Sequence, residues 1–299
     1  MFRIGVLGDL ICTLPMCAEI RRRHPHPLLL YVTMRDYKTM VQLAREPDGV
    51  YGARSWKFVP TWSVFGLVEK VYAPETTDER TKSAGPTCHL VDDLANSCGI
   101  SPDDRQPHLY PPAALIERVR TGHGLQNRRL IAINGGRTWP VREWGFDRWQ
   151  ALVNLIHAEF DVTILLFGVG EAIPLHGVES FVNHRVLADE MAAIIAACDL
   201  VISIDSGPVH LAGAVGTPVV GLFGAVDPRL RLPPGSRAMA VEADVPCLHC
   251  HHRTPRGHWQ TGCPNDIRCM KELAVNAVFE AVKENLSLSY NSNSAGQRS

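Results

Sequence analysis

The chain has 299 residues, 45% of them hydrophobic and 20% charged, which is the composition of a folded globular protein with room for two domains. Its 30 Lys and Arg residues balance 31 Asp and Glu residues, so no overall field attracts nucleic acid or an anionic membrane surface. No apolar run reaches the roughly 20 residues of a membrane-spanning helix, which leaves at most a peripheral membrane contact.

The N-terminal part begins as an alternating α/β pattern. "FRIGV" predicts a strand, "GDL" a turn, and residues 11–23 a helix that Pro25 ends. "LLLYVTM" predicts a second strand and residues 35–46 a second helix. Asp9 interrupts the apolar N-terminus, which argues against a secretory signal and favours a cytoplasmic protein. We expect a short first domain at residues 1–122.

The second part alternates more clearly, after a polar, glycine-bearing linker candidate at 120–127. The predicted strands are 129–134, "VTILLFG", "LVISI" and "VVGLFG", and the predicted helices are 147–159, 188–197 and 208–215. Uninterrupted apolar strands separated by helices indicate a parallel sheet covered on both faces. We expect a second domain at 128–285, a disordered polar tail at 286–299, and two facing Rossmann-like domains with a cleft between them.

The junction "VISIDSGPVHLAG" carries polar residues where a strand turns into a helix. Asp205 follows the strand, at the edge of the sheet where ligands gather. Ser206 is a good N-cap and Pro208 suits the first turn, so a helix begins here with free amides that favour an anion such as phosphate. Gly207 permits close backbone approach, and His210 adds a donor one turn later.

Other interpretations of this junction remain open. Asp205 and Ser206 also fit helix capping alone, and the residues by themselves favour that interpretation. A serine hydrolase is disfavoured, because its nucleophile elbow needs glycine where this chain has Ile204. No G-x-G-x-x-G dinucleotide fingerprint follows a strand.

Four cysteines near the C-terminus have a spacing that suits a metal. Cys247 and Cys250 form C-x2-C, followed by Cys263 and Cys269, and four thiols of this kind can bind structural zinc or iron tetrahedrally. Reduced cysteines or a local disulfide are equally compatible with the pattern.

Several motifs together resemble one family. They are "CDLVISIDSGPVHLAGAVGTPVVGLFG" with Asp227-Pro228 after it, "LGDLICTLP", "NGGRTWPVREWGFDRW" and the cysteine cluster. In these stretches the chain resembles glycosyltransferase family 9, the ADP-heptose:lipopolysaccharide heptosyltransferases. The resemblance implies a GT-B fold in which the C-terminal domain holds a nucleotide-sugar donor and the N-terminal domain a glycan acceptor.

The resemblance also implies a reaction and a set of site residues. Heptose would move with inversion from an ADP-heptose-like donor to a glycan such as lipopolysaccharide core, with no cofactor needed for the chemistry. By position, the donor diphosphate and sugar would lie against Asp205, Ser206, Gly207 and His210, the phosphates also against Thr138 and Arg142, and the ribose against Glu171.

Two positions depart from the family pattern. Arg142 stands where the family usually has lysine, and Gly135 where it has proline. An arginine offers a planar fork instead of a point charge, so the phosphate geometry would differ. Without the resemblance, Arg142 could equally form a surface salt bridge.

Asp9 distinguishes between the remaining functions. A carboxylate at the end of a strand is well placed to take a proton from an acceptor hydroxyl as general base, although it could simply cap the next helix. A transferase needs such a base, whereas a non-catalytic nucleotide-sugar binder does not. A nucleotide-sugar epimerase or hydrolase on the same fold is the further alternative.

Overall fold

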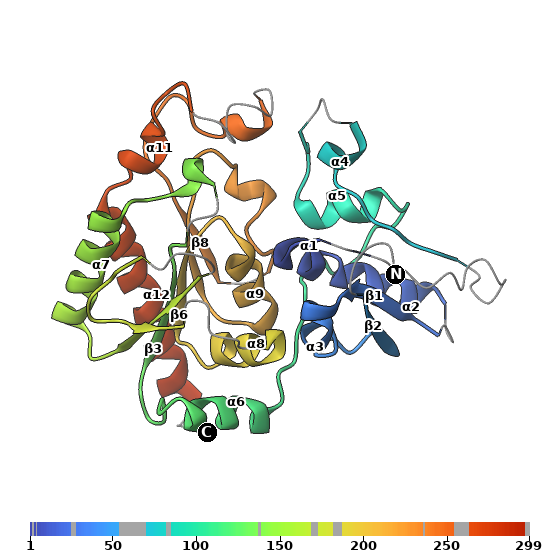
Figure 1. Cartoon of the computed structure of the whole chain (residues 1–299), viewed down its shortest axis with the longest axis horizontal. Coiled ribbons are helices and arrows are strands. Elements are labelled where there is room, and N and C mark those ends of the chain that lie inside the picture. The colour runs from blue at the N-terminus through green and yellow to red at the C-terminus, as the bar shows by residue number, and fades with distance from the viewer. Residues whose placement is uncertain are drawn as a thin grey trace.

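The computed structural model describes residues 1, 3, 5–24, 28–53, 70–81, 85–136, 139–168, 173–181, 187–235, 237–253 and 263–296. They form two α/β units that lie side by side, with the N-terminal unit, blue to cyan, packed against the C-terminal one (Figure 1). Within these ranges no helix is long and apolar enough to cross a membrane. The predicted donor residues Thr138 and Glu171 lie outside the described residues.

The C-terminal unit is built on a six-stranded sheet in which every neighbouring pair is parallel. Its strands are β3 (Leu130–Asn134), β4 (Thr163–Phe167), β5 (Glu179–Ser180), β6 (Leu200–Ile204), β7 (Val219–Leu222) and β8 (Ala238–Val241). Their order is β5-β4-β3-β6-β7-β8, the doubly wound order of a Rossmann fold. The order reverses direction between β3 and β6, which makes that pair the topological switch point.

Helices cover both faces of this sheet, because alternate residues of each strand point to opposite sides. Ile131 and Ile133 pack with the helices α7 (Phe146–Glu159) and α12 (Val275–Gly296). Leu130 and Ala132 join the opposite core, with α8 (Ala188–Ala196) and α9 (Gly207–Val215). Among the described residues the unit also contains α6 (Ala113–Gly122), which packs on α8, and the short α11 (Arg268–Lys271).

The N-terminal unit is smaller. Its parallel pair is β1 (Leu30–Met34) and β2 (Gly49–Ala53), and its helices are α1 (Leu7–Cys12), α2 (Leu14–Arg23), α3 (Lys38–Val41), α4 (Thr77–Thr81) and α5 (Leu90–Asn96). The expected first strand is not assigned among the described residues, yet the chain start runs beside β1. Val32 donates to the Met1 carbonyl, and Arg3 donates to that of Val32. The helix expected at 35–46 shortens to a 3-10 turn, Arg35–Tyr37, followed by α3.

The segment in which the chain passes from the N-terminal unit to the C-terminal unit is not the linker expected at 120–127. Helix α6 already belongs to the C-terminal unit, where Arg120 donates to the carbonyl of Ala197 in the turn after α8. The chain crosses earlier: Leu109 donates to the Ala214 carbonyl of α9, and the next amide, of Tyr110, donates to Leu43 after α3. Glycine and polar residues at 120–127 therefore end a helix and form a turn, and the boundary expected at residue 122 moves toward the N-terminus.

The C-terminal tail also differs from expectation. Residues 286–299 were expected to be disordered, whereas α12 continues through Gly296. The first half of α12 buries Val278, Val282 and Leu286 against the sheet. A helix nucleated by that packing extends at low cost, since each serine or asparagine lowers helix stability by only about 0.5–0.7 kcal/mol relative to alanine.

Candidate active site at the β6–α9 junction

The candidate site begins at the switch point between β3 and β6. Asn134 ends β3, and its side-chain amide donates to the Ser206 hydroxyl at 2.7 Å and to the Ser203 hydroxyl at 3.2 Å. This bridge ties the carboxyl end of β3 to the turn that follows β6. Ligands of open parallel sheets bind in the crevice outside such a pair of strand ends. Sequence analysis did not single out Asn134, although a polar residue that ends a buried strand at the switch point is a usable signal.

Ser206 starts α9 in a different way from the one expected. It holds the N-cap position with an extended backbone, φ −165°, but its side chain makes no capping hydrogen bond. The hydroxyl instead accepts from Asn134 and donates to the Ile204 carbonyl at 3.1 Å. Pro208 has no N–H, and the Val209 amide donates to the Ser206 carbonyl at 3.1 Å, so an anion at this helix start would meet the amides of Ser206 and Gly207.

Arg142 and Asp205 form an ion pair over this junction. Nη2 of Arg142 lies 3.1 Å from Oδ2 of Asp205, and Nη1 donates to the Asp205 backbone carbonyl at 3.0 Å. The Arg142 guanidinium also stacks 4.2 Å from the centre of the Trp139 ring. The two charged side chains are only 18% and 8% exposed, so Arg142 is not a surface salt bridge. The loop after β3 thus brings a cation to the start of α9.

Two buried side-chain atoms of this ion pair are left without a hydrogen bond. Oδ2 of Asp205 and Nε of Arg142 are buried and make no aligned hydrogen bond. A buried carboxylate oxygen without a hydrogen bond costs free energy unless a partner supplies one. A hydroxyl of a bound sugar is a donor that would satisfy Asp205.

His210 points toward the N-terminal unit. Its Nδ1 lies 3.4 Å from the sulfur of Cys12 in α1, and both side chains are buried. Burial lowers the pKa of His210 to about 3 and outweighs the opposing charge of Asp205, so the ring is neutral at neutral pH. A neutral imidazole donates one hydrogen bond at most, which makes His210 a weaker phosphate partner than a cation.

Two glycines bring α1 against α9. A Cβ at Gly8 would lie 2.7 Å from Cδ2 of His210, and a Cβ at Gly207 would lie 2.9 Å from Cβ of Leu7. Real Cβ atoms essentially never approach so closely. The sequence predicts close backbone approach at Gly207. The structure shows what approaches both glycines, because the two units meet here through α1 and α9.

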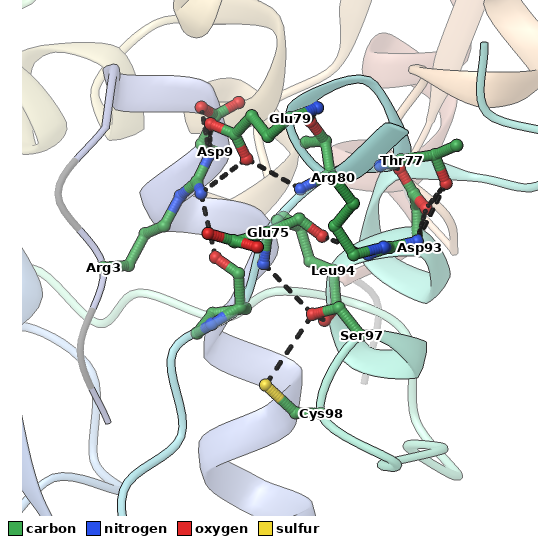
Figure 2. A network of polar contacts seen from close by, with 12 residues as sticks. Arg3, Asp9, Glu75, Thr77, Glu79, Arg80, Asp93, Leu94, Ser97 and Cys98 are labelled. Atoms are coloured by element: carbon green, nitrogen blue, oxygen red, sulfur yellow. Dashed lines mark hydrogen bonds and ion pairs between the residues drawn. The ribbon is translucent and has the colours of Figure 1, made fainter. Parts of the chain in front are cut away.

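Asp9 lies in the first turn of α1, directly after Gly8. Its Oδ2 accepts from Nη2 of Arg3 at 2.8 Å, and the same guanidinium binds Glu79 of α4 (Figure 2). The residue at the α1 N-cap is Val6, which makes no side-chain capping bond, so Asp9 is not the helix cap that the alternative interpretation required. Sequence analysis missed Arg3 and Glu79.

The four predicted metal-ligand cysteines lie near one another but do not form a metal site in the described part of the chain. Burial and then the charges of Cys247, Cys250 and Cys263 raise the pKa of Cys269 to about 11. Among the described residues none of the four cysteines forms a disulfide. Among the described residues, no three His, Cys, Asp or Glu side chains are arranged to hold a metal. The geometry therefore does not fit the expected tetrahedral site, and no catalytic step is derived from a metal.

The family model described as glycosyltransferase family 9 (heptosyltransferase) matches residues 92–259, more than half of the chain and all of the β6–α9 junction. The chain belongs to this family. The resemblance noted in the sequence is thereby confirmed.

Heptosyltransferases from other bacteria are similar to parts of this family-9 chain. Lipooligosaccharide heptosyltransferase 2 of Campylobacter jejuni is 34% identical over 183 residues, which cover 54% of this chain and 53% of the relative. Lipopolysaccharide core heptosyltransferase OpsX of Haemophilus influenzae is 49% identical over 112 residues, 34% of this chain and 32% of the relative. These matches span from about a third to about half of the length of the relatives.

Solved structures show the fold over nearly the whole chain. The glycosyltransferase family 9 protein of Veillonella parvula superposes with a TM-score of 0.73 at 16% identity and covers 95% of both chains. E. coli ADP-heptose lps heptosyltransferase II gives 0.72 at 15% identity and covers 97% of this chain and 99% of the other. Together with the parallel sheet of the C-terminal unit, these superpositions confirm the GT-B fold expected for family 9.

Proposed function

We propose that the chain is an inverting glycosyltransferase that moves heptose from an ADP-heptose-like donor to a glycan acceptor of the lipopolysaccharide-core kind, with Asp9 as general base. Family membership and the printed names of the relatives, heptosyltransferases of lipopolysaccharide and lipooligosaccharide, support this activity. A fold neighbour has been crystallised with ADP-2-deoxy-2-fluoro heptose, which supports the choice of donor.

One observation carries the donor site. At the switch point, the first turn of α9 is not capped by the Ser206 hydroxyl, and Arg142 is held beside it by Asp205 and Trp139. The diphosphate would accept from the backbone amides of Ser206 and Gly207 and from the Arg142 guanidinium. Asp205 would accept from a sugar hydroxyl. Thr138 and Glu171 remain predicted phosphate and ribose contacts.

Asp9 belongs to α1, which contacts α9 from the N-terminal unit, and would act on the acceptor from that side. It follows Gly8, which packs on His210 of α9, so the carboxylate lies at the border between the units. During attack on the anomeric carbon it would take the proton of the acceptor hydroxyl. The acceptor oxygen gains the bond to carbon, and ADP leaves with the electron pair of the bond that breaks.

The rival function is a nucleotide-sugar-binding protein without transfer activity. It is favoured by the ion pair of Asp9 with Arg3, because the Arg3 guanidinium already occupies one oxygen of the carboxylate that would take the proton. Asp9→Asn separates the two functions, since asparagine keeps an oxygen that accepts from Arg3 and cannot take a proton.

The experiment measures donor affinity by calorimetry and transfer from ADP-heptose to heptose-deficient lipopolysaccharide by mass spectrometry. Asp9→Asn should bind donor like the parent while transfer falls roughly 100-fold or more. Asp205→Ala should weaken donor binding itself. Equal transfer by Asp9→Asn and the parent would remove Asp9 from the mechanism, and unchanged affinity of Asp205→Ala would remove the donor site from this junction.

A further inference from the structure

Arg3 links Asp9 to a second carboxylate that comes from a distant part of the chain. Nη2 of Arg3 donates to Asp9 at 2.8 Å, while Nη1 and Nη2 donate to the two oxygens of Glu79 at 2.9 and 3.1 Å. Nη1 also donates to the carbonyl of Pro74 at 2.9 Å. Figure 2 shows Arg3 joined by dashed lines to Asp9 of α1 and Glu79 of α4. One guanidinium thus holds Asp9 and is itself held from two sides.

The side chains of Arg3, Asp9 and Glu79 differ in the fraction of their surface that is exposed to solvent. The side chain of Arg3 is 5% exposed, that of Asp9 24% and that of Glu79 44%. Burial opposes the charge of Arg3, but the hydrogen bond to Glu79 and the charge of Asp9 outweigh it and raise the pKa of Arg3. Burial likewise opposes the charge of Glu79, and hydrogen bonds from Arg3 and Thr76 outweigh it and lower the pKa of Glu79. One fixed positive charge is therefore shared by two carboxylates.

Helix α4, which carries Glu79, is fixed to α5. Asp93 of α5 accepts from the backbone amide of Thr77 at 2.8 Å, from its hydroxyl at 2.5 Å, and from Arg80 at 3.3 Å. Thr76 donates its amide to Glu79 at 2.7 Å. Glu79 is thus presented to Arg3 by a braced helix (Figure 2).

Other titratable or charged groups lie on the elements around α1, and they are Cys12, Tyr31, His89, Asp93, His210 and Arg231. Burial raises the pKa of Cys12 and of Tyr31 and lowers that of His210, so these three are neutral at neutral pH. Burial also lowers the pKa of His89, and Asp93 is engaged by Thr77 and Arg80. Among the described residues, the charged groups that share hydrogen bonds with Asp9 or with its partner are instead Arg3 and Glu79.

We infer that Arg3 and Glu79 are positioning residues for Asp9, Arg3 fixing the direction of its carboxylate and Glu79 fixing the Arg3 guanidinium. This inference rests on the proposed function of Asp9 as the base. Glu79 accepts from both Nη groups of Arg3, which holds the plane of the guanidinium and directs Nη2 at the Asp9 carboxylate.

The two residues should act on the pH profile of transfer with opposite signs. Loss of the negative charge of Glu79 favours the ionised form of the neighbouring base, so the acid limb of the kcat/KM profile moves to lower pH. Loss of the positive charge of Arg3 disfavours the ionised form, so the acid limb moves to higher pH. A residue that merely stabilised the fold would lower activity without moving the limb.

The test compares Glu79→Gln, Arg3→Met and Arg3→Lys with the parent, using ADP-heptose and heptose-deficient lipopolysaccharide. We expect the acid limb to rise by about one pH unit or more in Arg3→Met and to fall by a smaller amount in Glu79→Gln. Arg3→Lys keeps the charge and loses the fork, so the limb should stay near its parental position while kcat falls ~10-fold or more. Donor affinity should be unchanged in all three.

Asp92→Asn is the matched control. It removes a carboxylate partner of another arginine in the same unit, Arg105, whose Nη2 lies 2.6 Å from Asp92, and it should leave the pH profile at its parental position. If Arg3→Met does not fold, Glu79→Gln carries the test, because its side chain is 44% exposed. If the acid limb of the kcat/KM profile lies at the parental pH in both Glu79→Gln and Arg3→Met, this inference is wrong, while the proposed function of the chain stands. Absence of transfer by the parent overturns the proposed function and, with it, this inference.

Discussion

A methyl group at position 8 tests the contact between the two units. In Gly8→Ala the added carbon would lie 2.7 Å from Cδ2 and 3.3 Å from Nε2 of His210. His210 has little room to retreat, because it is buried and its Nδ1 already lies 3.4 Å from Cys12. Overpacking of this kind costs about 1–3 kcal/mol, whereas alanine gains up to about 1 kcal/mol over glycine in a helix. We expect a net loss of about 1–2 kcal/mol in the free energy of unfolding.

The assay is thermal unfolding of the parent and variants at one pH. A loss of this size lowers Tm by about 2–8 °C for a domain of 150–250 residues. Gly122→Ala is the control, because nothing lies within 4 Å of a Cβ there, and it should be neutral or slightly stabilising. Adding His210→Ala to Gly8→Ala should cost less than the sum of the single changes. A Gly8→Ala variant as stable as Gly122→Ala would refute the packing of α1 on α9.

Three further outcomes are expected. Because the pKa of His210 is about 3 in the folded chain and about 6.5 when unfolded, the unfolded state takes up the proton first as pH falls. Stability should therefore drop by about 1.4 kcal/mol per pH unit between about pH 6.5 and 3, and urea titrations of His210→Gln should lack this component. Elemental analysis tests the zinc or iron predicted from the sequence. Because the described cysteines do not form a tetrahedral site, we expect folded protein without metal, and about one metal per chain that is lost when Cys250 and Cys263 become serine would contradict this expectation. Small-angle scattering should show a smaller radius when donor saturates the protein, and an unchanged radius counts against closure of the cleft.

The C-terminal unit could be predicted from the sequence because each strand is a short apolar run bounded by polar residues. β3, β4, β6 and β7 fall within the predicted runs, and α7, α8 and α9 begin within one residue of the predicted starts. Strands β5 and β8 were missed because they lie at the sheet edges, where two to four residues carry little pattern. The continuation of α12 was missed because its polar second half follows the packing of its first half.

The candidate site was predictable to the extent that it is local in sequence. Asp205 and Ser206 follow a strand, and the loop that carries Arg142 follows the neighbouring strand, so the two strand ends bring them together. The partners of Asp9 were not predictable, since Glu79 lies 76 residues from Arg3 and neither residue belongs to a motif. The packing role of Gly8 requires knowing that α1 meets α9, which no spacing in the sequence indicates.

The central claim is that this family-9 chain transfers heptose from a nucleotide-sugar donor to a glycan. The most direct measurement incubates the purified protein with ADP-heptose and heptose-deficient lipopolysaccharide, and follows the glycan by mass spectrometry and the new linkage by NMR. The account predicts that the glycan gains a heptose whose anomeric configuration is opposite to that of the donor, with release of ADP. Donor that is bound, hydrolysed or epimerised while the glycan stays unchanged would contradict it.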